Sequence, residues 1–404
     1  MTAVDWYAQT ATRYDRANRE TLGWLLARSA ASDVIDTKVN PITGADYGAA
    51  DGLRGPGWTY GWIQGRGLEA LASFAPHYAD KDPDLADRLE TRVRRLYPKV
   101  AGLLDASGHG YFLYGPEGPV QVDTGAPQQA GPGIYTYSDA FLAKGLVAAA
   151  ALVAPGDLDR RLDYLRRVVT AVETGRFQMG ERGALSAEAV AAEPDDFGPR
   201  MILLGAAGML HRAGLSSWTG YADRFIDQVL DRYRDPGTGT LFNIPGESLR
   251  NLGHTVEFVG FALDHLQYVP GSQGRVAELG DLLLRTLEMG LGTPGIPLFY
   301  DAVKRAPASP YYPWWPVAET IRAAALLAQA GAAEAARPYW EKADRAFFDH
   351  YWQPGRGYAH QTLGPDGPVD YVPATPDLDP AYHTSLSLRA AETAARALAR
   401  NEGA

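Results

Sequence analysis

Six glycine-containing turns divide the chain into six stretches of similar length, and this regularity limits the fold more than any other feature. One glycine from each turn lies about 58 to 66 residues from the next, and a sixth of the 404-residue chain is about 67 residues. These glycines are Gly44, Gly110, Gly175, Gly237, Gly295 and Gly357. Because a unit of this length holds two helices, the spacing predicts six consecutive helical hairpins.

The stretches between the turns carry the periodicity of amphipathic helices. Apolar residues recur at i, i+3, i+4 and i+7 in about twelve segments, as expected for helices with one buried face. Good examples are 68–74, 140–152, 201–210, 256–266, 317–328 and 386–398. No linker rich in serine or charge separates these segments, so we expect an all-α single domain over residues 1–404, in which the hairpins close into a toroid.

Short β-hairpins are expected in the loops of this toroid. Two near-identical turns, Gly-Pro-Glu-Gly-Pro-Val at 115–120 and Gly-Pro-Asp-Gly-Pro-Val at 364–369, follow short aromatic or β-branched runs. A ring of paired helices also leaves a central funnel. Loops at its wide end would form a concave site, the usual setting for a small-molecule pocket.

Composition and charge exclude several classes of function. The chain has 38 basic and 48 acidic residues, and its net charge of −10 opposes a general affinity for nucleic acid or anionic lipid. It has no cysteine, which excludes disulfides, thiolate nucleophiles and cysteine-ligated metals. No apolar run reaches the roughly 20 residues needed to span a bilayer, and no secretory signal is readable. We therefore expect a cytoplasmic protein without nucleic-acid or membrane partners.

Aromatic residues gather where several helices are expected to begin. The clusters are Trp58, Tyr60 and Trp62; Tyr135 and Tyr137; and Tyr311, Tyr312, Trp314 and Trp315. Flat rings stack on the CH faces of sugars and leave the hydroxyls to polar neighbours, so these clusters indicate a carbohydrate ligand. Packing between helix layers explains them equally well.

Polar residues at three helix starts could carry the chemistry. Arg66 lies one turn after Trp62, where its guanidinium could hold a sugar oxygen, although a surface salt bridge is the simpler interpretation. His254 and Glu257 share a helix face, so the carboxylate could orient the imidazole for acid/base work. His383 begins a helix in the sixth unit, and in a closed ring the two imidazoles would face each other across one ligand.

Glu319 is the last candidate. It follows Trp314 and Trp315 by one helical turn and places a carboxylate below two indoles. The alternative is an acidic residue that merely complements the dipole of its helix.

Taken in order, these motifs resemble those of the N-acylglucosamine 2-epimerase superfamily, which also contains cellobiose 2-epimerases and mannose isomerases. The matching stretches are 62–66, 137–141 with 145–146, 199–204, 253–257, 314–319 and His383. They cover most of the chain from about residue 58 to 395, and the first 55 residues match poorly. The resemblance implies an (α/α)6 barrel and a cofactor-independent, metal-free reaction at C1 and C2 of a free reducing sugar.

The resemblance also implies roles for individual residues. His254 and His383 match the general acid/base pair of the family, Arg66 its arginine, and Glu257 and Glu319 its glutamates. Aromatic side chains, together with Glu319, are expected to bind the sugar. These substrate-binding candidates are Tyr60, Trp62, Tyr137, Trp314, Trp315 and Glu319.

The sequence leaves several functions open. Epimerisation at C2 of an N-acylglucosamine/N-acylmannosamine pair, or of a related hexose, is the first hypothesis, and aldose–ketose isomerisation of the mannose/fructose type is the alternative. A glycoside hydrolase on the same fold would pair Glu257 with Glu319. A non-catalytic sugar-binding protein is the last candidate. We expect a monomer or homodimer.

Two departures from the family pattern bear on the substrate. The mannose isomerase and cellobiose epimerase branches carry a further histidine on the helix that here reads Met201-Ile-Leu-Leu-Gly205, and the branch acting on N-acylated hexosamines lacks it. The family also often has histidine where this chain has Val317. The first departure favours an epimerase with two catalytic histidines.

Overall fold

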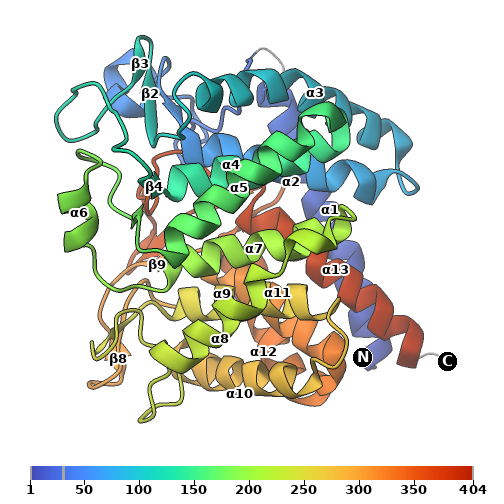
Figure 1. The fold of residues 1–404 in the computed structure, drawn as a ribbon. Helices are drawn as coiled ribbons and strands as arrows, with labels where there is room; N and C mark the ends of the chain where they lie inside the picture. Colours follow the sequence, from blue (N-terminus) through green and yellow to red (C-terminus); the bar gives the residue numbers. More distant parts are fainter. Residues whose placement is uncertain (1, 30–31, 403–404) are drawn as a thin grey trace.

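Six pairs of helices form a closed ring in the computed structural model, which describes residues 2–29 and 32–402 (Figure 1). The inner helices are α2 (Gly61–Tyr78), α4 (Tyr137–Val153), α7 (Gly198–Arg212), α9 (Leu252–Leu266), α11 (Trp315–Leu327) and α13 (His383–Glu402). The outer helices are α1 (Ala3–Ser29), α3 (Pro83–Asp105), α5 (Leu158–Glu173), α8 (Tyr221–Tyr233), α10 (Gln273–Gly290) and α12 (Ala333–Ala346). The expected (α/α)6 barrel is therefore confirmed.

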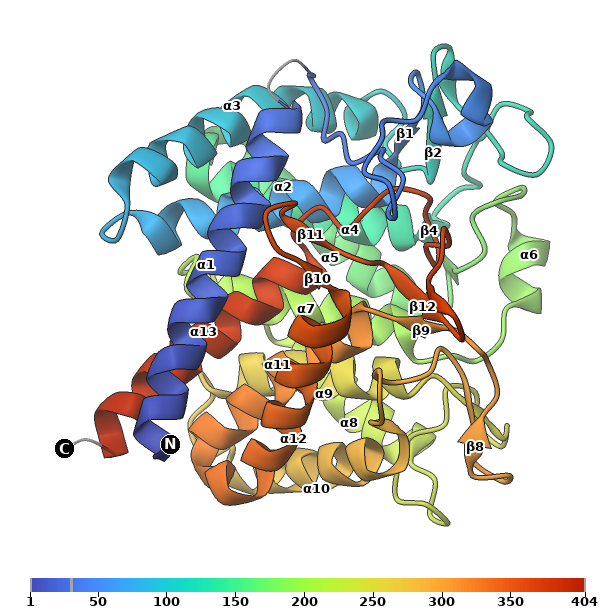
Figure 2. The same cartoon turned by 180° about the vertical axis from the view of Figure 1, so that it is seen from behind.

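The sixth hairpin joins the two ends of the chain. Inner helices contact their neighbours in the order α2, α4, α7, α9, α11 and α13, and Arg389 of α13 closes the ring by donating to the backbone oxygen of Ser73 on α2 at 2.8 Å. The outer partner of α13 is α1, and the two lie side by side (Figure 2). The poorly matching N-terminal region thus supplies the helix that completes the ring.

Burial distinguishes the two layers. On inner helix α4 every residue from Ser138 to Ala150 is buried, because the helix is covered on all sides. The outer helix α5 buries mainly one apolar face, which includes Leu162, Leu165, Val168 and Val172. Apolar side chains of both layers belong to one large hydrophobic cluster.

Short strands lie next to the N-terminal ends of the inner helices. The strands β1 (Thr59–Tyr60), β4 (Tyr135–Thr136), β6 (Leu249–Arg250) and β9 (Tyr312–Pro313) directly precede α2, α4, α9 and α11. Both expected hairpins are confirmed, β2 (Leu113–Gly115) with β3 (Gly118–Pro119) and β12 (Thr362–Gly364) with β13 (Gly367–Pro368). This face of the barrel therefore carries ordered loops.

The remaining elements complete this loop layer and the helix ends. They are β5 (Phe177–Gln178), β7 (Tyr300–Asp301), β8 (Ala306–Pro307), β10 (Trp352–Gln353), β11 (Tyr358–Ala359), α6 (Ala187–Ala192) and the short helices Ala49–Arg54, Pro155–Asp157, Ser216–Trp218, Ala328–Ala332 and Phe347–Tyr351. The sheets are small, with strand orders β1-β2-β3, β6-β7-β8 and β13-β12-β9 and the pairs β4-β5 and β10-β11. Among the described residues, no helix has the length and apolar character that crossing a membrane requires.

Candidate active site

A cavity of about 250 Å³ opens at the N-terminal ends of the inner helices. Its walls come from all six inner helices and from the loops above them. The lining residues are Trp62, Arg66, Tyr137, Phe141, Met201, Ile202, Asn251, His254, Glu257, Leu298, Trp314, Trp315, Pro373, Ala374 and His383. All six stretches that carry the sequence motifs therefore meet in one space.

The loop before α13 fixes the position of His383. The carboxylate of Asp379 accepts hydrogen bonds from the backbone N–H groups of Tyr382, His383 and Thr384, at 2.9, 3.1 and 2.8 Å. It thereby satisfies donors at the helix start that have no partner within the helix. Ala381 reaches this turn with φ at +68°, a conformation that a non-glycine residue adopts only where its surroundings enforce it.

Glu319 orients the His383 ring. Its Oε1 lies 3.0 Å from His383 Nδ1, and its Oε2 lies 3.1 Å from Arg322 Nη1. A carboxylate at Nδ1 accepts the ring N–H, so the neutral imidazole keeps its lone pair on Nε2. Burial and then the nearby cation of Arg66 hold the pKa of His383 well below its ordinary value of 6.5. His383 is thus an unprotonated base at neutral pH.

A second carboxyl, Glu257, lies next to this pair. Its Oε1 is 3.8 Å from His383 Nδ1. Burial, followed by repulsion from Glu319, raises the pKa of Glu257 to about 8, and burial raises that of Glu319 to about 7. Glu257, whose pKa is raised by burial and by Glu319 together, is therefore the carboxyl of the pair that favours its protonated form near neutral pH.

The partner of His254 differs from the one that we expected. Its Nδ1 lies 3.2 Å from the amide Nδ2 of Asn243, and the Oδ1 of Asn243 accepts the backbone N–H of Asn251 at 2.7 Å. This second bond fixes the amide orientation, so Nδ2 donates to the ring and the neutral imidazole carries its proton on Nε2. The expected orientation of His254 by Glu257 is wrong, because Glu257 turns toward His383 instead.

The environment of His254 also opposes a positive charge. Burial and then the nearby His383 lower the pKa of His254 to about 4. The indole of Trp315 lies beside both imidazoles, with ring centroids 5.5 Å from His254 and 5.7 Å from His383. The two rings from α9 and α13 therefore meet at one aromatic wall of the same cavity.

Arg66 makes no salt bridge within the described part of the chain, so the simpler interpretation of this residue does not hold. Its guanidinium carbon lies 4.1 Å from the ring centroid of Phe141, 5.1 Å from that of Trp62 and 5.4 Å from that of Tyr382. Its buried Nε lacks a hydrogen-bond partner. Burial lowers the pKa of Arg66, yet a guanidinium remains charged in proteins. The cavity thus holds a cation with unused donors.

The predicted aromatic residues divide between the cavity and the core. Trp62, Tyr137, Trp314 and Trp315 line the cavity, whereas Tyr60 does not. Tyr60 pairs with Leu113 in a β-ladder and is only 3% exposed, with its ring packed in the core. Its expected contact with substrate is therefore not supported by its position.

Glu319 likewise lies outside the cavity lining. It is fully buried beneath His383, because its carboxylate is taken by that ring and by Arg322. Its position fits a residue that orients the base and does not fit the substrate contact that we expected.

Three further residues act on the site, although none was singled out from the sequence. Asn243 and Asp379 position the two histidines, and Glu181 accepts the indole N–H of Trp62 at 2.8 Å. Asp379 could have been found from the sequence, because it is an aspartate four residues before a helix start. Neither Asn243 nor Glu181 stands in a recognisable motif, because both come from irregular loops.

One group of side chains has the composition of a metal site. Ligand atoms of Glu257, Glu319 and His383 lie within 4.8 Å of one another. The cations of Arg66, Arg322 and Lys144 also act on Glu257 and would repel a bound metal ion. The absence of a metal cofactor therefore stays a prediction that this charge distribution favours.

Comparisons with known proteins place the fold. No family model matches the sequence, and no curated protein matches it significantly. The solved structure of a D-mannose isomerase aligns with a TM-score of 0.70 at 13% identity, over 95% of this chain and 97% of that chain. A cellobiose 2-epimerase from Spirochaeta thermophila DSM 6192 aligns with a TM-score of 0.69 at 14% identity, over 97% and 98%.

Other enzymes on sugars share the barrel less closely. An unsaturated glucuronyl hydrolase specific for heparin aligns with a TM-score of 0.55 at 10% identity, over 96% of this chain and 98% of that chain. The chain therefore has the fold of the sugar epimerases and isomerases that its motifs resemble.

Proposed function

We propose that this protein is a carbohydrate isomerase that moves the proton at C2 of a free reducing monosaccharide, and that it inverts C2. The observation that carries this proposal is the pair of imidazoles, His254 and His383, that line one cavity from different helices. The similarity in fold to sugar epimerases and to a mannose isomerase agrees with it.

His383 is the base in the proposed reaction. Its neutral ring offers the Nε2 lone pair, and Glu319 stabilises the imidazolium that forms when the ring takes the C2 proton. The open-chain sugar becomes an enediolate, which bears negative charge on its oxygens. Arg66, with its unpaired guanidinium, and the Nε2–H of His254 can donate to that charge.

Inversion needs a proton from the face opposite to His383, and we propose that His254 delivers it from Nε2 as the imidazolium, after Nδ1 has taken a proton from solvent. The transfer leaves a neutral ring with its proton on Nδ1, and the Nε2 lone pair is then the base for the reverse reaction. His383 removes one proton from C2, and His254 supplies another from the opposite face, so the configuration at C2 is inverted. Substrate with the other configuration would react in the opposite direction through the same two groups.

We propose an N-acylated hexosamine as the substrate class. The wall formed by α7 presents Met201 and Ile202 to the cavity, at the helix where related isomerases carry a further histidine. Two apolar side chains accommodate an acyl methyl group better than they accommodate a hydroxyl.

Aldose–ketose isomerisation is the second candidate, and one contact favours it. Asn243 donates to Nδ1 of His254, which opposes the protonated ring and the tautomer with a free Nε2 lone pair. If His254 only polarises the carbonyl, His383 alone would return the proton to C1 and give the ketose.

Glycoside hydrolysis fits the site less well. The carboxyls of a hydrolase flank the scissile bond, about 5 to 9.5 Å apart. Glu257 and Glu319 instead lie side by side against the same ring, and Glu319 is outside the cavity.

An NMR screen of free sugars in D2O tests the proposal. We expect deuterium at C2 together with the C2 epimer, with N-acetylglucosamine and N-acetylmannosamine as the first pair. A ketose product would select the second candidate. No exchange at C2 with any aldose or acylated hexosamine, by protein whose fold is verified by circular dichroism, would overturn both.

A further inference from the structure

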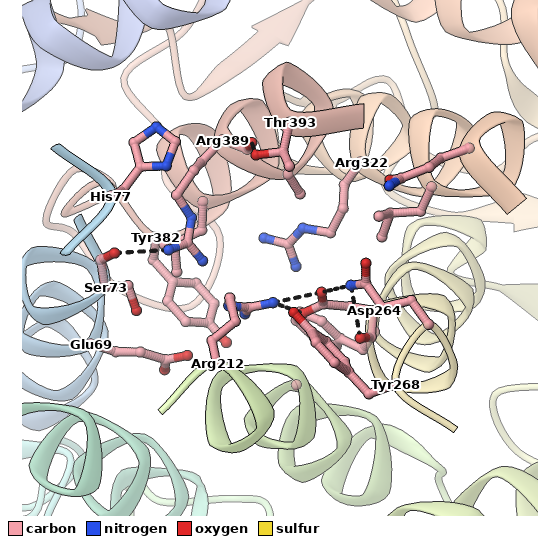
Figure 3. Close-up of a pocket in the computed structure, with 17 residues that line it drawn as sticks. Glu69, Ser73, His77, Arg212, Asp264, Tyr268, Arg322, Tyr382, Arg389 and Thr393 are labelled. Carbon is pink, nitrogen blue, oxygen red and sulfur yellow. Dashed lines mark hydrogen bonds and ion pairs between the residues drawn. The ribbon is translucent and has the colours of Figure 1, made fainter. Parts of the chain in front are cut away.

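A second cavity lies inside the barrel toward the C-terminal halves of most inner helices (Figure 3). It has a free volume of about 120 Å³ and shares no lining residue with the candidate active site. A single water molecule needs about 10 to 15 Å³ of such space, so this cavity has room for a small solute. Nothing in the proposed reaction uses it.

Three arginines from three helices face this cavity. Figure 3 shows the guanidinium groups of Arg212 on α7, Arg322 on α11 and Arg389 on α13 directed toward the same space. The carboxylates in the lining are Glu69 and Asp264. Cations therefore outnumber carboxylates around the cavity.

The two carboxylates already have partners. Asp264 pairs with Arg212 at 2.6 Å, and Glu69 pairs with Lys144 at 3.3 Å. Arg322, another of the three arginines that face the cavity, pairs with Glu319 of the candidate active site. These pairs leave no carboxylate of the lining for Arg389.

Arg389 is the uncompensated cation. Within the described ranges no carboxylate lies within 4.0 Å of it, and its hydrogen bond goes to the backbone oxygen of Ser73. Burial and then repulsion from Arg212 lower the pKa of Arg389 to about 9. Of the groups that face it, Asp264 and Glu69 act in the opposite direction, and Arg322 adds to the repulsion. A largely enclosed cation without a counterion costs free energy, which a bound anion would offset.

Neutralisation of helix dipoles does not explain this arginine. Cations stabilise the C-terminal end of a helix. Arg389 lies in the second turn of α13, which runs from His383 to Glu402, so its charge is near the wrong end.

We propose that this cavity is a binding site for a small oxyanion of the phosphate or sulfate class, held chiefly by Arg389. A guanidinium presents two parallel N–H donors to two oxygens of such an ion. Arg212 and Arg322 lie across the cavity and contribute positive potential, and the hydroxyl of Tyr268 in the lining can donate to a further oxygen.

Titration of the full-length protein with sodium phosphate, by calorimetry and thermal unfolding, tests the site. The ionic strength is held constant with sodium chloride. We expect saturable binding of one phosphate per chain, a rise in Tm, and binding at least tenfold weaker in Arg389→Gln. Arg94→Gln, which changes an exposed arginine paired with Glu90 on α3, should bind as the wild type does.

Further variants locate the ion and guard against misfolding. Thr393 is an exposed residue of α13 at the cavity, so Thr393→Glu should fold and repel the anion, whereas Thr393→Gln should not. Arg66→Gln, in the other cavity, should leave phosphate binding unchanged. Three results would overturn the proposal. They are an absence of saturable phosphate binding to the wild type, equal phosphate binding by Thr393→Glu and Thr393→Gln, and loss of phosphate binding in Arg66→Gln alone. Failure of the sugar screen would not affect these outcomes.

Discussion

The two histidines of the candidate site are held by partners of opposite character. Glu319 accepts from Nδ1 of His383, while Asn243 donates to Nδ1 of His254. The neutral rings therefore present a lone pair and an N–H, respectively, at Nε2. This difference divides base and hydrogen-bond donor between the two rings before any substrate is bound.

The buried carboxyl Glu257 makes stability depend on pH. Its pKa rises from 4.5 to about 8 on folding, so between these values the native state binds a proton that the unfolded state does not. The free energy of unfolding then falls as pH rises, by about 1.4 kcal/mol per pH unit from this group. We expect Glu257→Gln, which mimics the protonated carboxyl, to lose less stability than the wild type between pH 5 and pH 9.

Denaturant unfolding at both pH values measures this difference. Glu117→Gln, in the exposed turn between β2 and β3, serves as the control and should follow the wild type. An identical pH dependence in Glu257→Gln and the wild type would show that Glu257 does not hold the proton.

The sequence located the histidines better than their partners. The helix starts at Leu252 and His383 could be predicted from the sequence, and they place both imidazoles in one cavity. Spacing of i, i+3 shows only that His254 and Glu257 share a helix face. The actual partner of His254 is set by the loop that brings Asn243 to its ring. Because the backbone of this loop is irregular, the sequence has no periodic pattern that would predict the contact.

At the level of the helices, α2 and α4 pack closely because glycines meet at their crossing. A Cβ added to Gly145 would lie 2.3 Å from the backbone oxygen of Gly65, and one added to Gly65 would lie 2.3 Å from the backbone of Phe141. Both helices carry residues of the candidate site, namely Trp62, Arg66 and Tyr137. This contact therefore sets the width of the cavity on that side.

Gly145→Ala should force the two helices apart. We expect a loss of about 1–3 kcal/mol in the free energy of unfolding, as for other overpacked cores. The same substitution at Gly102, an exposed position of α3 with no atom near the added Cβ, should instead stabilise by about 0.5–1 kcal/mol. Urea unfolding of both variants measures this contrast, and equal effects would contradict the close approach.

For the whole molecule, ring closure depends on the N-terminal helix. The side chain of Trp340 on α12 is fully buried against α1, with ring centroids 5.1 Å from Trp6 and 5.7 Å from Tyr7. Its indole N–H donates to the hydroxyl of Tyr14 at 2.8 Å. The helix that the family resemblance did not cover is thus anchored in the core.

Trp340→Ala should cost about 3–5 kcal/mol, the usual range for removing a large buried ring. Phe299→Ala removes a ring that is 43% exposed and should change stability by less than about 0.5 kcal/mol. Thermal and denaturant unfolding compare the two. Similar stabilities would mean that α1 is not needed to hold the ring together.

The architecture was predictable because turn spacing and helical periodicity are properties of the chain alone. The role of α1 was not, since the pairing of the first helix with the last joins segments that are more than 350 residues apart. No sequence motif predicts the second cavity either, because Arg212, Arg322 and Arg389 come together only when the ring closes.

The most direct test of the account is solvent exchange at C2 in the single variants His254→Asn and His383→Asn, with His350→Asn at an exposed position as the control. We expect each active-site variant to lose interconversion of the two epimers, while His254→Asn, which keeps the base His383, still exchanges the C2 proton of one epimer only. The control should interconvert both. Full interconversion in either His254→Asn or His383→Asn would contradict a reaction carried out by two imidazoles at one carbon.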